Sequence, residues 1–154
     1  MSVYYSTTNH LGVDFSANIK DVYCGLGVSV VVGNGAKGTN YSKTMGPNAF
    51  PMDIYETLIV DNGSLYISAG FNVTDKILLN GNIGYGQKVK IYNAYDPNQI
   101  LSPSGFYYTS SYLGSDILLG AFCQYHLGNW ALYFGYDTYN KLKMGVSFFL
   151  KENF

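Results

Sequence analysis

Residues 64–74 read SLYISAGFNVT, and their side chains alternate in character from one position to the next. Every second residue from Leu65 to Val73 is apolar, whereas the residues between them are Tyr, Ser, Gly and Asn. Successive side chains of a β-strand point to opposite faces, but residues two apart on an α-helix lie on nearly opposite sides. The segment therefore predicts a strand with one apolar face and one largely polar face.

The same alternation recurs in six further segments. Apart from Gly81, the apolar faces of all seven carry only apolar or aromatic residues, and none carries a charge. A shorter strand is predicted over residues 2–8, which brings the number of strands to eight. The pattern predicts an all-β chain, with residues 1–154 forming a single closed antiparallel up-and-down transmembrane β-barrel. The six further segments are residues 10–19, 22–33, 77–86, 116–126, 130–137 and 141–151.

The connections between the predicted strands differ in length. Short turns are expected near residues 20–21, 74–76 and 126–129, and long loops near 34–63 and 87–115. In an up-and-down sheet, alternate connections fall at the same rim, so short turns at one rim face long loops at the other. Outer-membrane barrels have this asymmetry. Within the first long loop, Asn62-Gly63 between strand-like runs predicts a hairpin in an extension of the sheet. A true barrel strand in this segment is the alternative.

The composition of the polar face indicates which face is inside. That face is rich in glycine and poor in charge, whereas a sheet exposed to water should carry many Lys and Glu residues. Small residues suit the narrow interior of an eight-stranded barrel. Tyr85, Tyr125 and Trp130 lie near strand ends, where aromatic girdles meet the membrane surface. We therefore expect the apolar face to contact lipid. A soluble calycin-like ligand-binding barrel, with its apolar face inside, is the alternative.

Composition and charge exclude other classes of protein. Charged residues make up 12% of the chain, about half of the usual share of roughly 25%. The net charge of −1 leaves no basic surface for nucleic acid. No apolar stretch has the roughly 18 residues that a membrane helix needs. Residues 1–5 show no basic or apolar leader, so we expect that an export signal has been removed and that the protein resides in the bacterial outer membrane.

The C-terminal segment carries a resemblance to a known family. Lys143, Gly145, Phe148 and Leu150 resemble the assembly signal of outer-membrane proteins, which has a polar residue, a glycine two positions later and two alternating apolar residues. Residues 151–153 separate this motif from the terminal Phe154. In size and architecture the chain resembles the small OmpA, OmpX and OmpW-like eight-stranded barrels. The resemblance implies the barrel-insertion machinery and the lipid bilayer as partners.

Seven polar or charged residues fall on the predicted interior face. We expect them to form a satisfied network that fills the barrel, because buried charges need partners. A polar conduit is the alternative. Asp137 and Lys141 flank a tight link and are expected to form a salt bridge. The seven residues are His10, Asp14, Asp116, Gln124, Asp137, Lys141 and Lys143.

No catalytic, cofactor-binding or metal-binding motif is present. Neither histidine has a serine two positions away on its strand face, and Cys24 and Cys123 match no metal or redox spacing. The two cysteines lie on the apolar faces of strands that are not sequence neighbours, so we expect two free thiols. The sequence favours a non-enzymatic outer-membrane barrel with a structural, accessory or partner-binding role through its Tyr-containing loops. A channel or carrier for a small or apolar ligand is the alternative function.

Overall fold

The computed structural model describes residues 1–19, 22–41 and 54–148, and its regular structure in these ranges is β-strand. No helix among them has the length and apolar character needed to cross a membrane. The strands are β1 (Ser2–Ser6), β2 (His10–Ile19), β3 (Val22–Val31), β4 (Thr39–Asn40), β5 (Ile54–Thr74), β6 (Ile77–Tyr95), β7 (Phe106–His126), β8 (Trp130–Asp137) and β9 (Lys141–Phe148).

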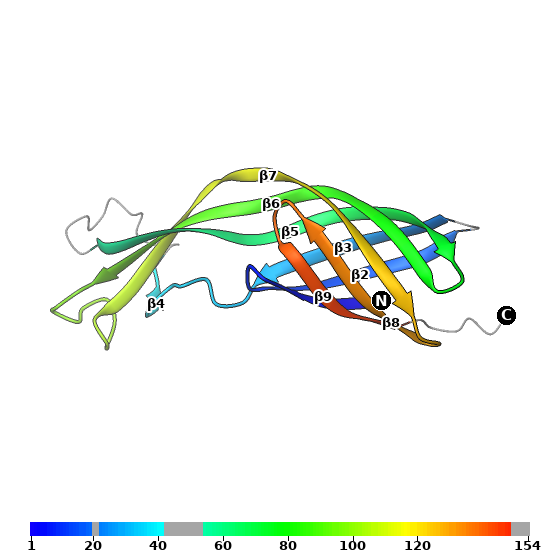
Figure 1. Ribbon diagram of the computed structural model, residues 1–154. Helices are drawn as coiled ribbons and strands as arrows, with labels where there is room; N and C mark the ends of the chain where they lie inside the picture. The colour runs from blue at the N-terminus through cyan, green and yellow to red at the C-terminus, as the bar shows by residue number, and fades with distance from the viewer. Residues whose placement is uncertain (20–21, 42–53, 149–154) are drawn as a thin grey trace. The chain divides into compact units, whose positions relative to one another are not determined.

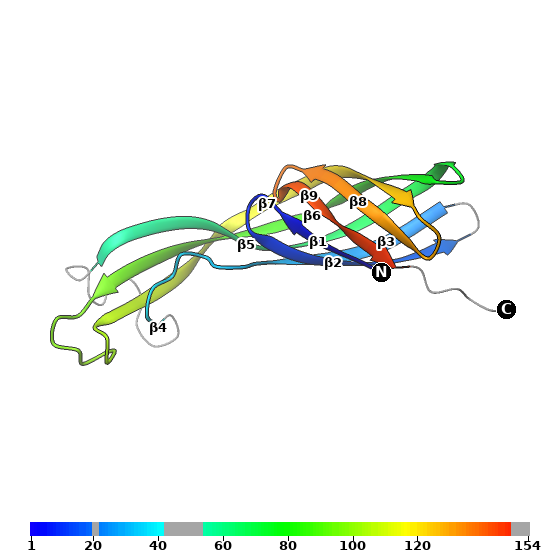
Figure 2. The same cartoon turned by 60° about the horizontal axis from the view of Figure 1, so that its bottom comes forward.

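Eight of these strands form a closed ring, as predicted. Their hydrogen-bonded order is β7-β6-β5-β3-β2-β1-β9-β8, and β8 pairs again with β7 to complete the ring (Figures 1 and 2). The strands run up and down, so neighbours in the ring are neighbours in sequence except where β1 meets β9. The predicted eighth strand is β1. The two-residue strand β4 pairs in parallel with β7.

The chain divides into two compact units. The barrel unit comprises residues 1–32, 63–86 and 116–154, and the second unit comprises 33–62 and 87–115. Strands β5, β6 and β7 contribute to both. The segments predicted as long loops are therefore largely continuous strand, over residues 54–63, 87–95 and 106–115.

The predicted Asn62-Gly63 hairpin was wrong, because both residues lie inside β5. Gly63 pairs with Val30 of β3 and continues the β3–β5 ladder. It has no positive φ, which a hairpin turn of this kind requires. Asn62 instead donates a hydrogen bond to Gln87 Oε1 at 3.1 Å. Pairing with neighbouring strands outweighs the local turn preference of the dipeptide.

The two rims of the barrel differ as the sequence predicts. At one rim the His126 amide donates to the Lys76 carbonyl at 2.8 Å, which joins the short turns after β5 and β7. At the other rim the Val32 amide donates to the Asn9 carbonyl at 2.6 Å. The chain leaves β3 there and enters the second unit. The predicted turn at residues 20–21 lies outside the described residues.

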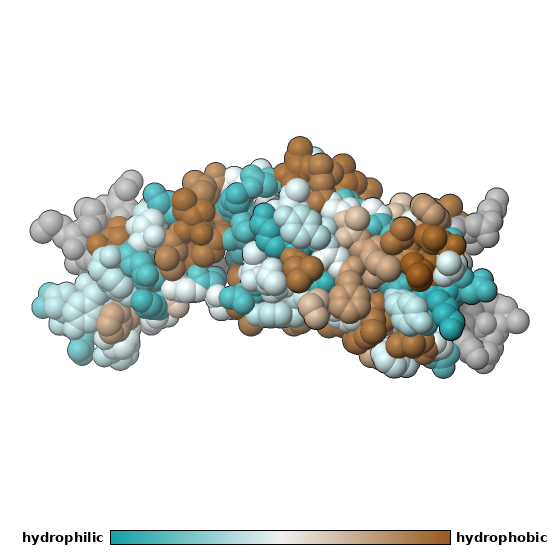
Figure 3. Space-filling model, in the orientation of Figure 1, coloured by the Kyte–Doolittle hydropathy of each residue, from teal (hydrophilic) through white to brown (hydrophobic). Residues whose placement is uncertain are grey.

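The apolar face of the barrel points outward. Leu26 is 50%, Ile67 60% and Phe134 44% exposed, although all three are large hydrophobic side chains. Between them along the strands, Ser68 and Tyr133 are buried. Figure 3 shows apolar side chains on the surface over the barrel strands. This arrangement is the reverse of a soluble barrel with an apolar core, and it confirms the predicted orientation of the two faces.

Aromatic rings fill the barrel interior. The rings of Tyr4 and Tyr133 stack with centroids 5.5 Å apart, and Phe122 stacks on Tyr133 at 4.7 Å. Together with Tyr66, Leu118 and Tyr139 they form one buried cluster. The interior is therefore a packed core, as expected for a barrel of eight strands.

Glycines on the interior face make space for these rings. A β-carbon at Gly12 of β2 would overlap the ring of Tyr4 on the neighbouring β1, and one at Gly27 of β3 would overlap the ring of Tyr66 on the neighbouring β5. The rings lie across the adjacent strand, where only glycine leaves room. This explains why the polar face of the sequence is rich in glycine.

Candidate functional site

The side chain of a lysine is buried in the barrel interior. Lys143 of β9 is fully buried, and its Nζ atom is 2.9 Å from Asp137 Oδ2. The same Nζ lies 4.7 Å from the ring centroid of Tyr66 and 4.8 Å from that of Tyr4. Removing a charge from water is costly unless it is paired, and aromatic ring faces also attract cations. We call Lys143, Asp137 and the surrounding rings of Tyr4, Tyr66, Phe122 and Tyr133 the Lys143 cluster.

The carboxylate of Asp137 has several other hydrogen bonds. It accepts from the Tyr139 amide at 2.9 Å, from the Asn140 amide and from Asn140 Nδ2 at 3.0 Å. Asn140 Oδ1 accepts in turn from Ser29 Oγ at 3.1 Å. Ser29 and Ser64 are hydrogen-bonded at 2.7 Å. The buried charges thus belong to a network that connects the β8–β9 turn to β3 and β5.

Five of the seven predicted interior residues lie in the interior. The five buried residues are His10, Asp14, Gln124, Asp137 and Lys143. The His10 amide donates to Ser6 Oγ at 3.0 Å. The Gln124 side chain donates to Ser2 Oγ at 3.4 Å. Asp14 interacts electrostatically with Lys143.

The other two predicted interior residues, Lys141 and Asp116, are exposed. Lys141 has a left-handed backbone with φ of 60°, and its Nζ atom donates to the Thr138 carbonyl at 2.7 Å. The predicted Asp137–Lys141 salt bridge is therefore wrong, and Lys143 takes its place. Asp116 precedes the first described β7–β8 pair, Gly120 with Asp137, so β8 does not cover it.

The aromatic residues of the Lys143 cluster were absent from the predicted site. Their signal in the sequence is the position of Tyr66, Phe122 and Tyr133 on the interior face of their strands, in register with glycine on a neighbouring strand. Gly27 lies opposite Tyr66 in the β3–β5 ladder, and Gly145 lies opposite Tyr133 in the β8–β9 ladder. An aromatic residue on the largely polar face of a strand, opposite a glycine of the neighbouring strand, therefore predicts a side chain inside the barrel.

The residues of the predicted assembly signal alternate between the two faces. Lys143 is buried, Gly145 is half-buried and Phe148 is 49% exposed on the outer face. Leu150 lies outside the described residues. The strand that carries the motif thus presents apolar side chains outward and its lysine inward.

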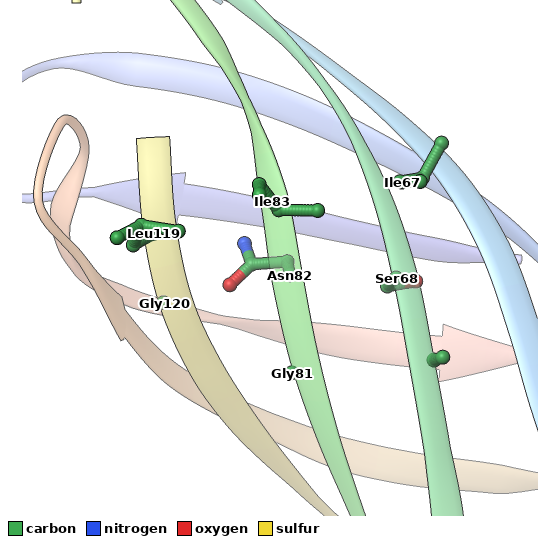
Figure 4. Close-up of a pocket in the computed structure, with 8 residues that line it drawn as sticks. Ile67, Ser68, Gly81, Asn82, Ile83, Leu119 and Gly120 are labelled. Carbon is green, nitrogen blue, oxygen red and sulfur yellow. The ribbon is translucent and has the colours of Figure 1, made fainter. Parts of the chain in front are cut away.

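Two shallow hollows mark the outer wall where side chains are small. One, of about 340 Å³, lies at Ala69 and Gly81 between the larger Ile67, Ile83 and Leu119 (Figure 4). The side chain of Asn82 at this point is directed toward the strand of Gly120. The second hollow, of about 430 Å³, is lined by Phe15, Ser16, Ala17, Cys24, Gly25 and Leu26. Neither hollow is lined by a histidine or a carboxylate.

A polar network orders the second unit. Asn93, which is buried, accepts a hydrogen bond from the Lys37 amide at 3.0 Å and donates to the Gly35 carbonyl at 3.0 Å and to Glu56 Oε2 at 2.9 Å. Lys37 Nζ lies 3.1 Å from the same carboxylate oxygen. The hydrogen bond from Asn93 and the interaction with Lys37 lower the pKa of the Glu56 carboxyl. Glu56 in turn raises the pKa of the Lys37 amine.

The loop between β6 and β7 is organised by one carboxylate. Burial of Asp96 opposes its ionisation, but hydrogen bonds from the Leu101, Asn98 and Ile100 amides outweigh burial and lower the pKa of its carboxyl. Ile100 itself is 79% exposed. The loop therefore holds an apolar side chain in solvent on an ordered backbone.

Exposed aromatic side chains also gather in the second unit. Tyr55, Tyr95 and Phe106 come from three strands, and the Tyr95 and Phe106 rings lie 4.9 Å apart. All three are between 41% and 49% exposed. Tyr and Phe are enriched in the cores of protein interfaces.

The described residues contain no group of three or more His, Cys, Asp or Glu side chains that could hold a metal ion. Cys24 and Cys123 are free thiols, as predicted. They project from β3 and β7, which are not neighbours in the ring.

Comparisons with known proteins give a structural similarity and no family. No family model matches the chain, and no curated protein matches it. Among solved structures, it is similar to the crystal structure of Ail, the attachment invasion locus protein of Yersinia pestis, at 12% sequence identity. The match covers 94% of this chain and 86% of that one, with a TM-score of 0.49. The barrel fold described above stands on the strand pairing of the chain itself.

Proposed function

We propose that this chain is a non-enzymatic integral barrel of the bacterial outer membrane, whose closed barrel anchors a second unit that contacts a partner. The observation that carries the proposal is the outer wall of the barrel, where large apolar side chains such as Ile67 and Phe134 are exposed. The residues that pair with these two in the described strand ladders are also uncharged, namely Leu26, Cys123 and Met144. Contact of such a surface with water is unfavourable, whereas its contact with the hydrocarbon of a lipid bilayer is favourable.

The filled interior supports an anchor over a channel. Tyr4, Tyr66 and Tyr133 are at most 1% exposed, and Lys143 lies among them. A conducting barrel would need an open, water-filled path instead. Pairing of the strands in a closed ring also fits the demand that backbone groups be hydrogen-bonded in lipid.

The character of the second unit supports the partner-binding role. It carries charged side chains such as Lys37 and Glu56 together with exposed Tyr55, Phe106 and Ile100. A mixture of exposed aromatic and polar groups is typical of protein interfaces.

Folding and conductance measurements test the membrane part of the proposal. We expect the unfolded chain to insert into phospholipid vesicles and to migrate on an SDS gel at two positions, before and after boiling. In planar bilayers the inserted protein should give no steady conductance. A chain that remains a folded monomer in buffer without detergent would contradict the membrane assignment, and a steady current would favour the channel.

Surface labelling tests whether the second unit lies outside the cell, where it could contact a partner. The variant Ile100→Cys, made with Cys24→Ala and Cys123→Ala, places one thiol on the exposed loop. A membrane-impermeant maleimide should label it in intact cells. Labelling only after cell lysis would contradict the proposal.

A further inference from the structure

One pair of neighbouring barrel strands, β1 and β9, is not consecutive along the chain. Strands β1 and β9 come from opposite ends of the described chain and pair from Ser2 with Ser147 to Ser6 with Lys143. Hairpin registers are fixed by the turns that join their strands. The β1–β9 register has no such constraint and must be set by side chains.

The apolar pattern alone does not set this register. In the observed pairing Val3 lies opposite Val146. A slip of two residues would place Val3 opposite Met144 or Phe148, both of which are also apolar and outward-facing. Because side chains repeat with a period of two, such a slip keeps every residue on its own face. Lipid contact therefore tolerates several closures, and the interior must select one.

The interior contacts of β1 and β9 are specific to one register. Tyr4 lies opposite Gly145, where a β-carbon would overlap the backbone of β1. Two residues before this glycine, Lys143 places its Nζ atom 4.8 Å from the Tyr4 ring. A slip of two residues would bring Tyr4 opposite Lys143 or Ser147 and remove the glycine from beneath the β1 backbone.

Contacts with β8 and β5 also hold Lys143 in place. The β8–β9 ladder pairs Gly135 with Lys143 and holds Lys143 beside Asp137. Tyr66, contributed by β5, lies 4.7 Å from the same Nζ atom. The position of the buried cation is therefore held by contacts with β8 and β5 that do not involve β1. The Tyr4 ring can then find its cation partner in only one alignment.

We infer that Lys143, together with Gly145, selects the register in which β1 and β9 close the barrel. Two residues of the predicted assembly signal thus act inside the finished barrel. The inference concerns the closed ring and does not depend on the partner-binding role proposed above.

Cysteine cross-linking between β1 and β9 measures the register directly. In a Cys24→Ala, Cys123→Ala background, the pair Val3→Cys with Val146→Cys reports the observed register, and Val3→Cys with Met144→Cys reports a slip of two residues. Directly opposed residues have β-carbons about 5 Å apart and diagonal ones about 7–8 Å, so brief oxidation should join only the first pair in the otherwise unaltered chain.

Removing the cation should redistribute the two cross-links. The variant Lys143→Met, Asp137→Asn, Asp14→Asn removes the cation together with the two buried carboxylates that it faces, leaves no unpaired charge there and is expected to fold. We expect its ratio of slipped to observed cross-link to rise by roughly 10-fold, through loss of a desolvated cation–π contact with Tyr4. Lys141→Met removes an exposed lysine two positions away and should leave the ratio unchanged.

A second variant keeps the ion pair intact. Tyr4→Leu removes the ring that receives the cation but leaves Lys143 beside Asp137, and it should raise the same ratio. If the folded Lys143 and Tyr4 variants both retain the original cross-link pattern, the inference is overturned. Failure of the unaltered barrel to enter membranes would instead contradict the proposed function, so the two failures are distinguishable.

Discussion

The barrel unit and the second unit use the same strands in different ways. Along β6, Leu78, Asn80 and Asn82 are buried in the barrel and the residues between them are exposed or glycine. Further along the same strand, in the second unit, Ile91, Asn93 and Ala94 are all buried. Along β6, the alternation of buried and exposed residues is therefore lost in the second unit.

The burial of charged residues also differs between the two units. Along the described barrel strands, the exposed charges are Lys141 and Asp116, at the first residue of β9 and where β7 enters the barrel unit, and the charges of Lys143, Asp137 and Asp14 are buried inside. In the second unit the Lys37–Glu56 pair is at the surface, with the lysine side chain 56% exposed. An exposed charge is stable in water and costly in lipid, so the comparison indicates that the two units face different solvents.

One pair of substitutions on β5 tests this difference most strongly. Ile67 in the barrel unit is 60% exposed and Ile59 in the second unit is 63% exposed. A lysine on the lipid face of a barrel costs about 2–4 kcal/mol near the middle of the membrane. Ile67→Lys should therefore lower the free energy of unfolding in vesicles by that amount, as measured by urea titration.

Ile59→Lys is the matched control on the same strand. A substitution on a water-exposed surface usually changes stability by no more than about 0.5 kcal/mol, and we expect that range here. Equal effects of the two substitutions would show that both positions face the same solvent, which contradicts the proposed membrane contact.

A second pair of substitutions compares the interior and the outer wall of the barrel. A β-carbon at Gly27 would overlap the buried Tyr66 ring, whereas at Gly81 the nearest atom would be 3.9 Å away. Overpacking a filled interior costs about 1–3 kcal/mol. Gly27→Ala should lower the free energy of unfolding by this amount, seen as a lower urea concentration at the midpoint of unfolding. Gly81→Ala should leave that midpoint nearly unchanged. A harmless Gly27→Ala would contradict the packed interior.

Acidification should affect the second unit locally. Because the pKa of Glu56 is lowered by Asn93 and Lys37, its ionised form stabilises the folded unit. This contribution is present above the ordinary glutamate pKa of about 4.3. It is lost as the pH falls through the lowered value. The amide signals of residues 35–37 should report this transition by NMR.

The variant Glu56→Gln is the control for the acid transition. It keeps an oxygen acceptor for Asn93 and removes the titrating group, so residues 35–37 should show no transition in the same pH range. The carboxyl of Asp96 also has a lowered pKa, and its titration should be seen at the amides of residues 98–101. An identical transition in Glu56→Gln would exclude Glu56 as its origin.

The buried site was only partly predictable from the sequence. Strand alternation placed His10, Asp14, Gln124, Asp137 and Lys143 inside, because side-chain direction follows from position along a strand. It also placed Lys141 inside, but the left-handed backbone at that residue turns its side chain outward. Residues next to turns depart from the alternation because the turn changes the direction of the chain.

By itself, the sequence determined the number of barrel strands and the face that points outward, but it did not predict that β5, β6 and β7 continue into the second unit. These properties follow from local alternation, since one solvent lies along each face of a strand. Only the tertiary structure decided that Lys143 pairs with Asp137, that Asp116 is exposed and that β5 continues through Gly63. Each of these depends on which residues lie opposite across a strand pair or where a neighbouring strand ends, and those relations are set by cross-strand register.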